Sequence, residues 1–104
     1  MAGLGKFLKQ AQKMQEQMQR VQDELAQREV QGSAGGGAVV ATATCDGSLK
    51  AIKIDPKVVD PSDAEMLEDL VVGAVTNALE LAKKTQSEEM AKITAGMSLP
   101  GMGM

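Results

Sequence analysis

Apolar residues recur along the first quarter of the chain with the spacing of a coiled-coil helix. Two sets each repeat every seven positions, and the second follows the first by three: Leu4, Ala11, Met18 and Leu25, then Phe7, Met14 and Val21. We call these residues the heptad seam. Glutamine, lysine and glutamate, which favour helices, fill most positions between them. The pattern predicts an amphipathic helix over residues 3–29, in which Arg28 ends the seam and Gly32 marks the break that follows.

Short strands are predicted after this helix. Residues 38–45 and 48–54 are rich in the valine, threonine and isoleucine that favour strands. Residues 28–33 are predicted as a first short strand, which ends before the flexible Gly35-Gly36-Gly37 segment. The middle of the chain therefore reads as a small antiparallel sheet.

Asp46-Gly47 is typical of a two-residue type I′ hairpin turn. The register that follows from this turn pairs Cys45 with Ser48, Ala43 with Lys50, Ala41 with Ile52, and Val39 with Ile54. One face of the sheet then carries small apolar side chains away from the turn. We expect that face to pack closely against helices.

A second long helix is predicted over residues 63–95. Ser62 and Glu65 have the spacing of a capping box with Ser62 as the N-cap. An apolar stripe follows at helical spacing, made of Leu67, Leu70, Val71, Ala74, Val75, Ala78, Leu81 and Ala82. Gly96 is a plausible stop. We expect one domain over residues 1–96 and a flexible tail over 97–104.

This order of elements predicts an α+β fold and a homodimer. A helix of about 27 residues is roughly 40 Å long, which exceeds the diameter of about 26 Å expected for a domain of this size. Part of the heptad seam would then project beyond the core of a monomer. A second copy packed seam against seam would cover it. In the alternative, the first helix folds back on the second helix within one chain.

The composition excludes most enzyme chemistry. The chain of 104 residues has no histidine and one cysteine, Cys45, so imidazole–thiolate metal sites and histidine-dependent catalysis are not available. The adjacent acids Glu68 and Asp69 lie on the predicted solvent face of the second helix. We therefore expect no enzyme activity, no metal and no cofactor. No apolar run is long enough to cross a bilayer, so a cytoplasmic protein without membrane contact is predicted.

Charge is segregated along the chain. Residues 1–22 carry four basic side chains and one acidic one, a net charge of +3, whereas residues 23–104 carry a net charge of −6. Lys6, Lys13 and Arg20 recur every seven residues, and Lys9 lies on a neighbouring position, so they form a ridge away from the seam. The usual reading of such a ridge is a solvated helix face. The other reading is a surface that binds phosphates of double-stranded DNA.

The basic residues differ in how many acids lie near them. Arg20 has Glu16 and Glu24 four residues away on either side, so we expect it to be neutralised within the helix. In the second helix, Glu80 precedes Lys84 and Glu88 precedes Lys92 by four residues, the spacing of structural ion pairs. The candidate nucleic-acid-binding residues are Lys6, Lys9, Lys13, Arg20 and Lys83.

Four segments together resemble the YbaB/EbfC family of bacterial nucleoid-associated proteins. They are KQAQKMQEQM at residues 9–18, EVQGSAGGG at 29–37, KIDP at 53–56 and EMLEDLVV at 65–72. The resemblance implies an α-β-β-β-α protomer, a tight, intertwined homodimer, and DNA binding with little or modest sequence preference. It also implies a role in organising the nucleoid, near recombination and replication functions. Of the candidate residues, Lys9 and Lys13 fall within a matched segment.

Two functions follow as hypotheses. The first is a dimeric, non-enzymatic protein of the nucleoid that binds duplex DNA mainly through its phosphates. The second is a protein-interaction module that recruits recombination or replication proteins through the heptad seam or the sheet.

Overall fold

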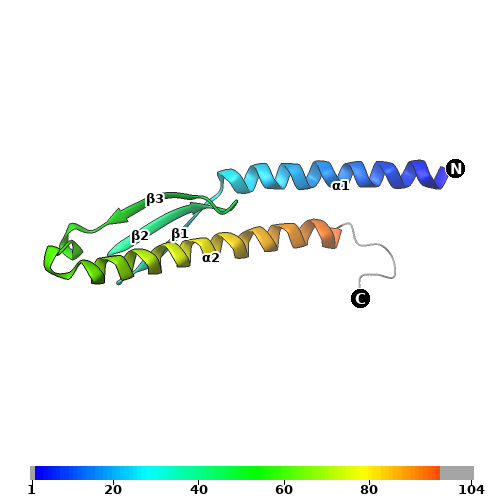
Figure 1. The fold of residues 1–104 in the computed structure, drawn as a ribbon. Helices are drawn as coiled ribbons and strands as arrows, with labels where there is room; N and C mark the ends of the chain where they lie inside the picture. Colours follow the sequence, from blue (N-terminus) through cyan, green and yellow to red (C-terminus); the bar gives the residue numbers. More distant parts are fainter. Residues whose placement is uncertain (1, 97–104) are drawn as a thin grey trace.

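The structure, a computed structural model, describes residues 2–96, and the predicted tail at 97–104 lies outside this range. Three antiparallel strands form one open sheet in the order β1-β2-β3, between two long helices in sequence (Figure 1). The elements are α1 (Ala2–Gln27), β1 (Glu29–Ala34), β2 (Val39–Thr44), β3 (Leu49–Ile54), the 3₁₀ turns η1 (Pro56–Val58) and η2 (Pro61–Asp63), and α2 (Ala64–Gly96). The predicted α+β class and α-β-β-β-α order are confirmed.

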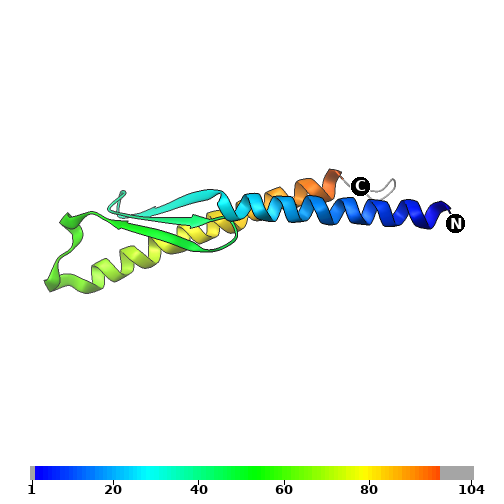
Figure 2. The same ribbon diagram turned by 90° about the horizontal axis from the view of Figure 1, so that it is seen from above.

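The core lies between one face of the sheet and α2, and its residues are small. Helix α2 runs along the sheet, mainly against β1 and β2 (Figures 1 and 2). The fully buried residues of this cluster are Val39, Ala41 and Ala43 on β2 and Ala74, Ala78 and Ala82 on α2. Because five of these six are alanines, the helix backbone can approach the sheet closely.

Gly32 marks the closest approach of α2 to the sheet. The first helix ends before Gly32, which lies inside β1 as the strand predicted over residues 28–33 implies, and it pairs with Ala41. A β-carbon added at Gly32 would lie 2.2 Å from the Ala78 backbone nitrogen and 2.6 Å from the Ala74 backbone oxygen. The glycine is therefore required because the helix backbone occupies the space of a side chain.

The turn between β2 and β3 differs from the prediction. Three residues, Cys45, Asp46 and Gly47, lie between the hydrogen-bonded Thr44 and Ser48, and only Gly47 among them has a positive φ. The Gly47 N–H donates to the Thr44 carbonyl at 3.0 Å, and the Thr44 N–H donates to the Ser48 carbonyl at 2.8 Å. This is the arrangement of a three-residue hairpin with a glycine bulge, since a type I′ turn needs two residues with positive φ.

This turn shifts the strand register near the hairpin. Ala43 pairs with Leu49, and the ladder is irregular between Thr42 and Ala43. The predicted pairing of Ala43 with Lys50 is therefore wrong, and so is that of Cys45 with Ser48, because Ser48 bonds to Thr44. Farther from the turn, the predicted pairs are confirmed: Val39 with Ile54 and Ala41 with Ile52. The bulge absorbs the extra residue before the hydrophobic pattern is affected.

Strand β3 is less covered than the sequence suggested. Ile52 was expected to pack under a helix with the rest of its face, but it is 39% exposed, and Leu49 is 45% exposed. The cause is the position of α2, which lies over β1 and β2 and leaves the β3 side of the sheet open. An apolar strip therefore remains on the surface of the protomer.

Helix α2 begins one residue later than the capping box predicted. The Asp63 carboxylate accepts a hydrogen bond from the Met66 N–H at 3.2 Å, so Asp63 caps the helix. The Ser62 hydroxyl instead donates to the Asp60 carboxylate at 2.7 Å. That carboxylate also accepts from the Ser62 N–H, and these bonds lower the pKa of Asp60.

The molecule is elongated because α1 projects from the sheet. Its extents are 73 × 26 × 16 Å and its radius of gyration is 20.1 Å, compared with about 13 Å for a compact domain of this size. Figure 1 shows α1 running well past the end of α2. The predicted projection of the helix is confirmed, and only its C-terminal part lies beside α2 within the chain.

Candidate nucleic-acid interface

The projecting part of α1 forms an arm, defined here as residues 2–20. From residue 3 onward its side chains are exposed except for Met14, which is half-buried. Along the heptad seam, exposure falls from 58% at Leu4 and 63% at Phe7 to 2% at Leu25. The heptad seam is therefore packed at the C-terminal end of α1 and bare near the free end of the arm.

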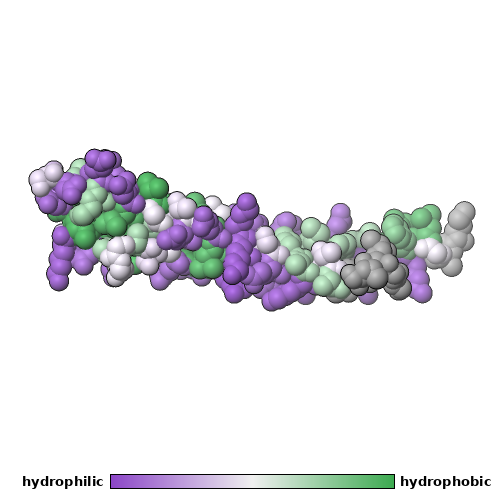
Figure 3. All heavy atoms as spheres, turned by 90° about the horizontal axis from the view of Figure 1, so that it is seen from below, coloured by the Kyte–Doolittle hydropathy of each residue, from purple (hydrophilic) through white to green (hydrophobic). Residues whose placement is uncertain are grey.

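Bare hydrophobic side chains gather near the free end of the arm. Leu8 lies beside the seam and is 56% exposed, close to the value for Leu4. Figure 3 shows hydrophobic surface at this end of the molecule and at the opposite end, separated by largely hydrophilic side chains. Exposed apolar surface of this kind is commonly found where proteins contact other macromolecules.

Three lysines occupy the outer face of the arm. Lys6, Lys9 and Lys13 are all exposed, and residues 3–15 contain no acidic side chain. Within residues 2–96, the ion pairs are Arg28–Glu89, Lys92–Glu89 and Lys50–Glu29, so none of the three lysines is in one. Among the described residues, no acidic side chain forms an ion pair with these three ammonium groups.

Arg20 lies at the base of the arm and is also exposed. The sequence predicted that Glu16 and Glu24 neutralise it, but the ion pairs of the described residues do not include Arg20. Both acids are still within one helical turn, so the local field at Arg20 is less positive than that at the lysines. The positive field along the ridge is therefore weakest at Arg20.

Lys83 lies apart from the four basic residues of α1. It is exposed on α2 and precedes Glu89, the residue at which α2 meets the end of α1. It therefore lies on the sheet side of this contact, whereas the arm extends on the other side. The structure brings together Lys6, Lys9, Lys13 and Arg20 but leaves Lys83 separate.

The ion pairs of α2 differ from the predicted ones. Lys92 pairs with Glu89 at 3.2 Å and not with Glu88, and Glu89 also accepts from Arg28 at 3.2 Å. The hydrogen bond from Lys92, and then Arg28, lower the pKa of the Glu89 carboxyl. Sequence reasoning missed Glu89, although a charged residue at the apolar seam position of Arg28 was a signal that an acid lies opposite.

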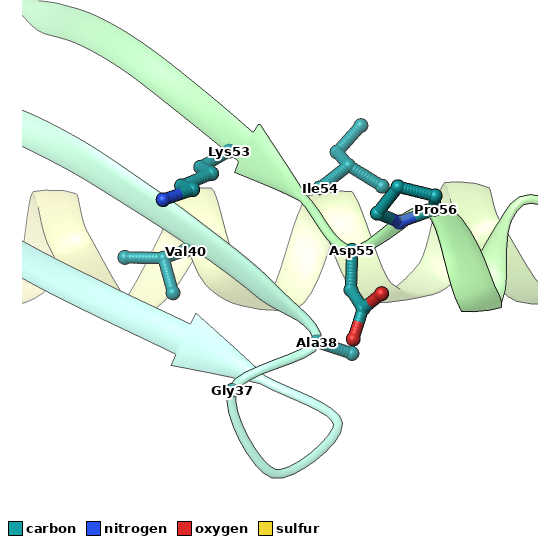
Figure 4. Close-up of a pocket in the computed structure, with 7 residues that line it drawn as sticks. All are labelled: Gly37, Ala38, Val40, Lys53, Ile54, Asp55 and Pro56. Carbon is teal, nitrogen blue, oxygen red and sulfur yellow. The ribbon is translucent and has the colours of Figure 1, made fainter.

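A shallow pocket of about 390 Å³ lies at the far end of the sheet from the arm. Figure 4 shows its lining residues, in which the charged ends of Lys53 and Asp55 lie apart from one another. The Asp55 carboxylate accepts from the Lys57 N–H at 3.0 Å and caps η1. The pocket thus contains one basic and one acidic side chain, and the acidic one caps η1. It does not extend the basic surface of the arm.

The fold has a solved counterpart. The crystal structure of the uncharacterized protein HP0035 from Helicobacter pylori superimposes with a TM-score of 0.73, covering 89% of this chain and 95% of that chain, at 16% sequence identity. At this identity the likeness establishes the fold: a helix, a three-stranded antiparallel sheet and a second long helix.

The family follows from sequence relatives. The model of the YbaB/EbfC DNA-binding family matches residues 1–97, and the chain belongs to this family of nucleoid-associated DNA-binding proteins. Nucleoid-associated protein NT01CX_0824 of Clostridium novyi is 48% identical over 99 residues, covering 95% of this chain and 87% of the relative. A nucleoid-associated protein of Acetivibrio thermocellus is 49% identical over 100 residues, covering 95% and 88%.

The comparison also places the chain outside enzyme families, since the family is a DNA-binding one. Within residues 2–96, neither helix combines the length and the apolar character that crossing a membrane requires.

Proposed function

We propose that this protein binds duplex DNA as a homodimer, mainly through phosphate contacts made by the arm and with little or modest sequence preference. The observation that carries the proposal is the position of Lys6, Lys9 and Lys13, which lie exposed and outside any ion pair of residues 2–96 on a helix that projects from the body. Lysine carries a compact point charge, and contacts between such a charge and phosphate carry no direct sequence information. Membership of a DNA-binding family supports DNA as the partner.

The homodimer is supported by the apolar surface that one copy leaves bare. Leu4 and Phe7 on the seam and Leu49 and Ile52 on β3 are each between 39% and 63% exposed. A second copy that covers the seam leaves the lysine ridge facing solvent, because the ridge lies away from the seam. The dimer then presents the ridge twice, which gives around six lysine–phosphate contacts.

The experiment compares two triple variants with equal changes in charge. Lys6, Lys9 and Lys13 are changed together to Gln in the arm variant, and Lys50, Lys53 and Lys57 are changed together to Gln in the control. Gel-shift titrations of duplex DNA are run over a range of salt concentrations. Since each phosphate contact adds about 0.9 to the slope of log K against log salt, the arm variant should lose a slope of about 5 and most of its affinity.

The control variant should keep most of the wild-type slope, because its lysines lie on β3 and η1 and not on the arm. Equal loss in the two variants would mean that net charge, and not the arm, governs binding. Wild-type binding by the arm variant would overturn the proposal.

A second candidate function is protein recruitment, including recombination or replication proteins. The specific observation in its favour is the exposure of Val59 and Val72, at 52% and 63%, away from both the arm and β3. This function requires complexes that survive nuclease digestion, whereas complexes bridged by DNA would dissociate. Both functions place the protein at the nucleoid, in the cytoplasm.

A further inference from the structure

The C-terminal end of α1 is attached to the body at a short joint. Helix α1 ends at Gln27 and β1 begins at Glu29, so Arg28 alone connects them. The Cys45 N–H donates to the carbonyls of both Leu25 and Arg28, at 3.0 and 2.9 Å. Leu25 and Cys45 are buried, at 2% and 0% exposure. These contacts fix where α1 leaves the sheet, at the β2–β3 turn (Figure 1).

One acidic side chain ties this joint to α2. The Glu89 carboxylate accepts from the Arg28 guanidinium and from the Lys92 ammonium, each at 3.2 Å. Arg28 and Glu89 are 61 residues apart in sequence, so this ion pair joins the end of α1 to α2. It adds a side-chain link to the backbone contacts at Cys45 and to the packing of the C-terminal part of α1 beside α2.

A small tilt at the joint becomes a large displacement at the lysines. Lys6 lies roughly 30 Å along the helix from Arg28, at 1.5 Å per residue. The phosphates of duplex DNA lie at fixed positions, so the lysines of the arm must be held at matching positions to bind them. Ordering a mobile arm on binding costs entropy and weakens the affinity.

We infer that Glu89, through its ion pair with Arg28, is a positioning residue that holds the basic arm in the direction needed for DNA binding. The inference rests on the proposed function of the arm. The negative charge of Glu89 by itself repels DNA phosphates. Its positioning role, in contrast, favours DNA binding, so the two effects have opposite signs.

This opposition allows a test by sign. In Glu89→Gln the net charge rises by one, so simple electrostatics predicts tighter DNA binding. The positioning role predicts binding that is weaker by about two- to fivefold, the range that corresponds to an exposed ion pair. Glu88→Gln is the matched control, since Glu88 is exposed, adjacent, and outside the ion pairs of residues 2–96. It should bind DNA as wild type or slightly more tightly, and Glu89→Asp should restore part of the affinity lost in Glu89→Gln.

The second readout is the arm itself. Nitroxide labels at Gln12→Cys and Thr76→Cys, in a Cys45→Ala background, report the distance between the arm and α2 by pulsed electron resonance. Glu89→Gln should broaden or shift this distance, and Glu88→Gln should not. Tighter or unchanged DNA binding in Glu89→Gln, or weaker binding with an unchanged distance, would overturn the inference. If the arm lysines prove irrelevant to DNA, the distance measurement alone decides, and an unchanged distance refutes it.

Discussion

Gly32 shows how a single residue sets the packing of the whole protomer. The backbone of α2 passes so close to β1 that Ala74 and Ala78 occupy the place where a side chain at position 32 would stand. The absence of a side chain at position 32 allows close contact between α2 and the sheet, whose shared core residues are almost all alanine. Small residues make such an interface possible, and its packing leaves no room for added atoms.

We therefore predict that Gly32→Ala lowers the free energy of unfolding by about 2 kcal/mol or more, because the new methyl group must push the helix from the sheet. Thermal unfolding followed by circular dichroism at a fixed protein concentration measures the change. Gly5→Ala is the control. Gly5 lies in α1 with open space around it, so alanine there should be neutral or stabilise by up to about 1 kcal/mol.

At the scale of elements, the residue at which α2 begins depends on flanking residues that the capping-box pattern does not include. The spacing of Ser62 and Glu65 fits a capping box, but Pro61 begins a 3₁₀ turn that moves the helix start by one residue. The Asp60 carboxylate then accepts a hydrogen bond from the Ser62 hydroxyl, and Asp63 becomes the N-cap of α2. Between β3 and α2, Asp55, Asp60 and Asp63 thus cap η1, η2 and α2 in succession.

Substitution of Ser62 and of Asp63 tests which of the two residues is the N-cap of α2. Asp63→Ala should destabilise the protein by about 1 kcal/mol, since the Met66 N–H loses its acceptor. Ser62→Ala should cost less, because the Ser62 hydroxyl caps no helical N–H. Urea titrations of both variants give the difference. A larger loss for Ser62→Ala would show that the serine, as the sequence suggested, is the functional cap.

At the scale of the whole molecule, the chain separates its charge and its bare apolar surface along one axis. The net charge is −3, yet the arm carries lysines and no acid from residue 3 to residue 15. The 73 Å length keeps this arm away from the acidic remainder. A protein that is acidic overall can therefore present a basic surface to DNA.

Much of this plan could be predicted from the sequence. The heptad seam is longer than a compact domain is wide, so projection of α1 followed from length alone. The alternation in β2 gave the buried face, and the pairs Val39–Ile54 and Ala41–Ile52 followed from it. These features depend on periodicity, which is a local property of the chain.

Other features could not be predicted, because they depend on contacts distant in sequence. The Asp46-Gly47 signal fits hairpin loops of two or of three residues, and the ladder decides between them. The pairing of Arg28 with Glu89 requires knowing which turn of α2 lies beside the end of α1. The exposure of Ile52 depends on where α2 crosses the sheet, which periodicity does not specify.

Sedimentation velocity at micromolar protein, with circular dichroism on the same samples, tests most directly whether one chain suffices. We predict a well-folded species of twice the chain mass, in which a second copy shields Leu4, Phe7 and Ile52 from water. A folded particle of one chain mass across this concentration range would contradict the account. The exposed apolar surface would then be stable in a monomer, and each particle would carry one lysine ridge and not two.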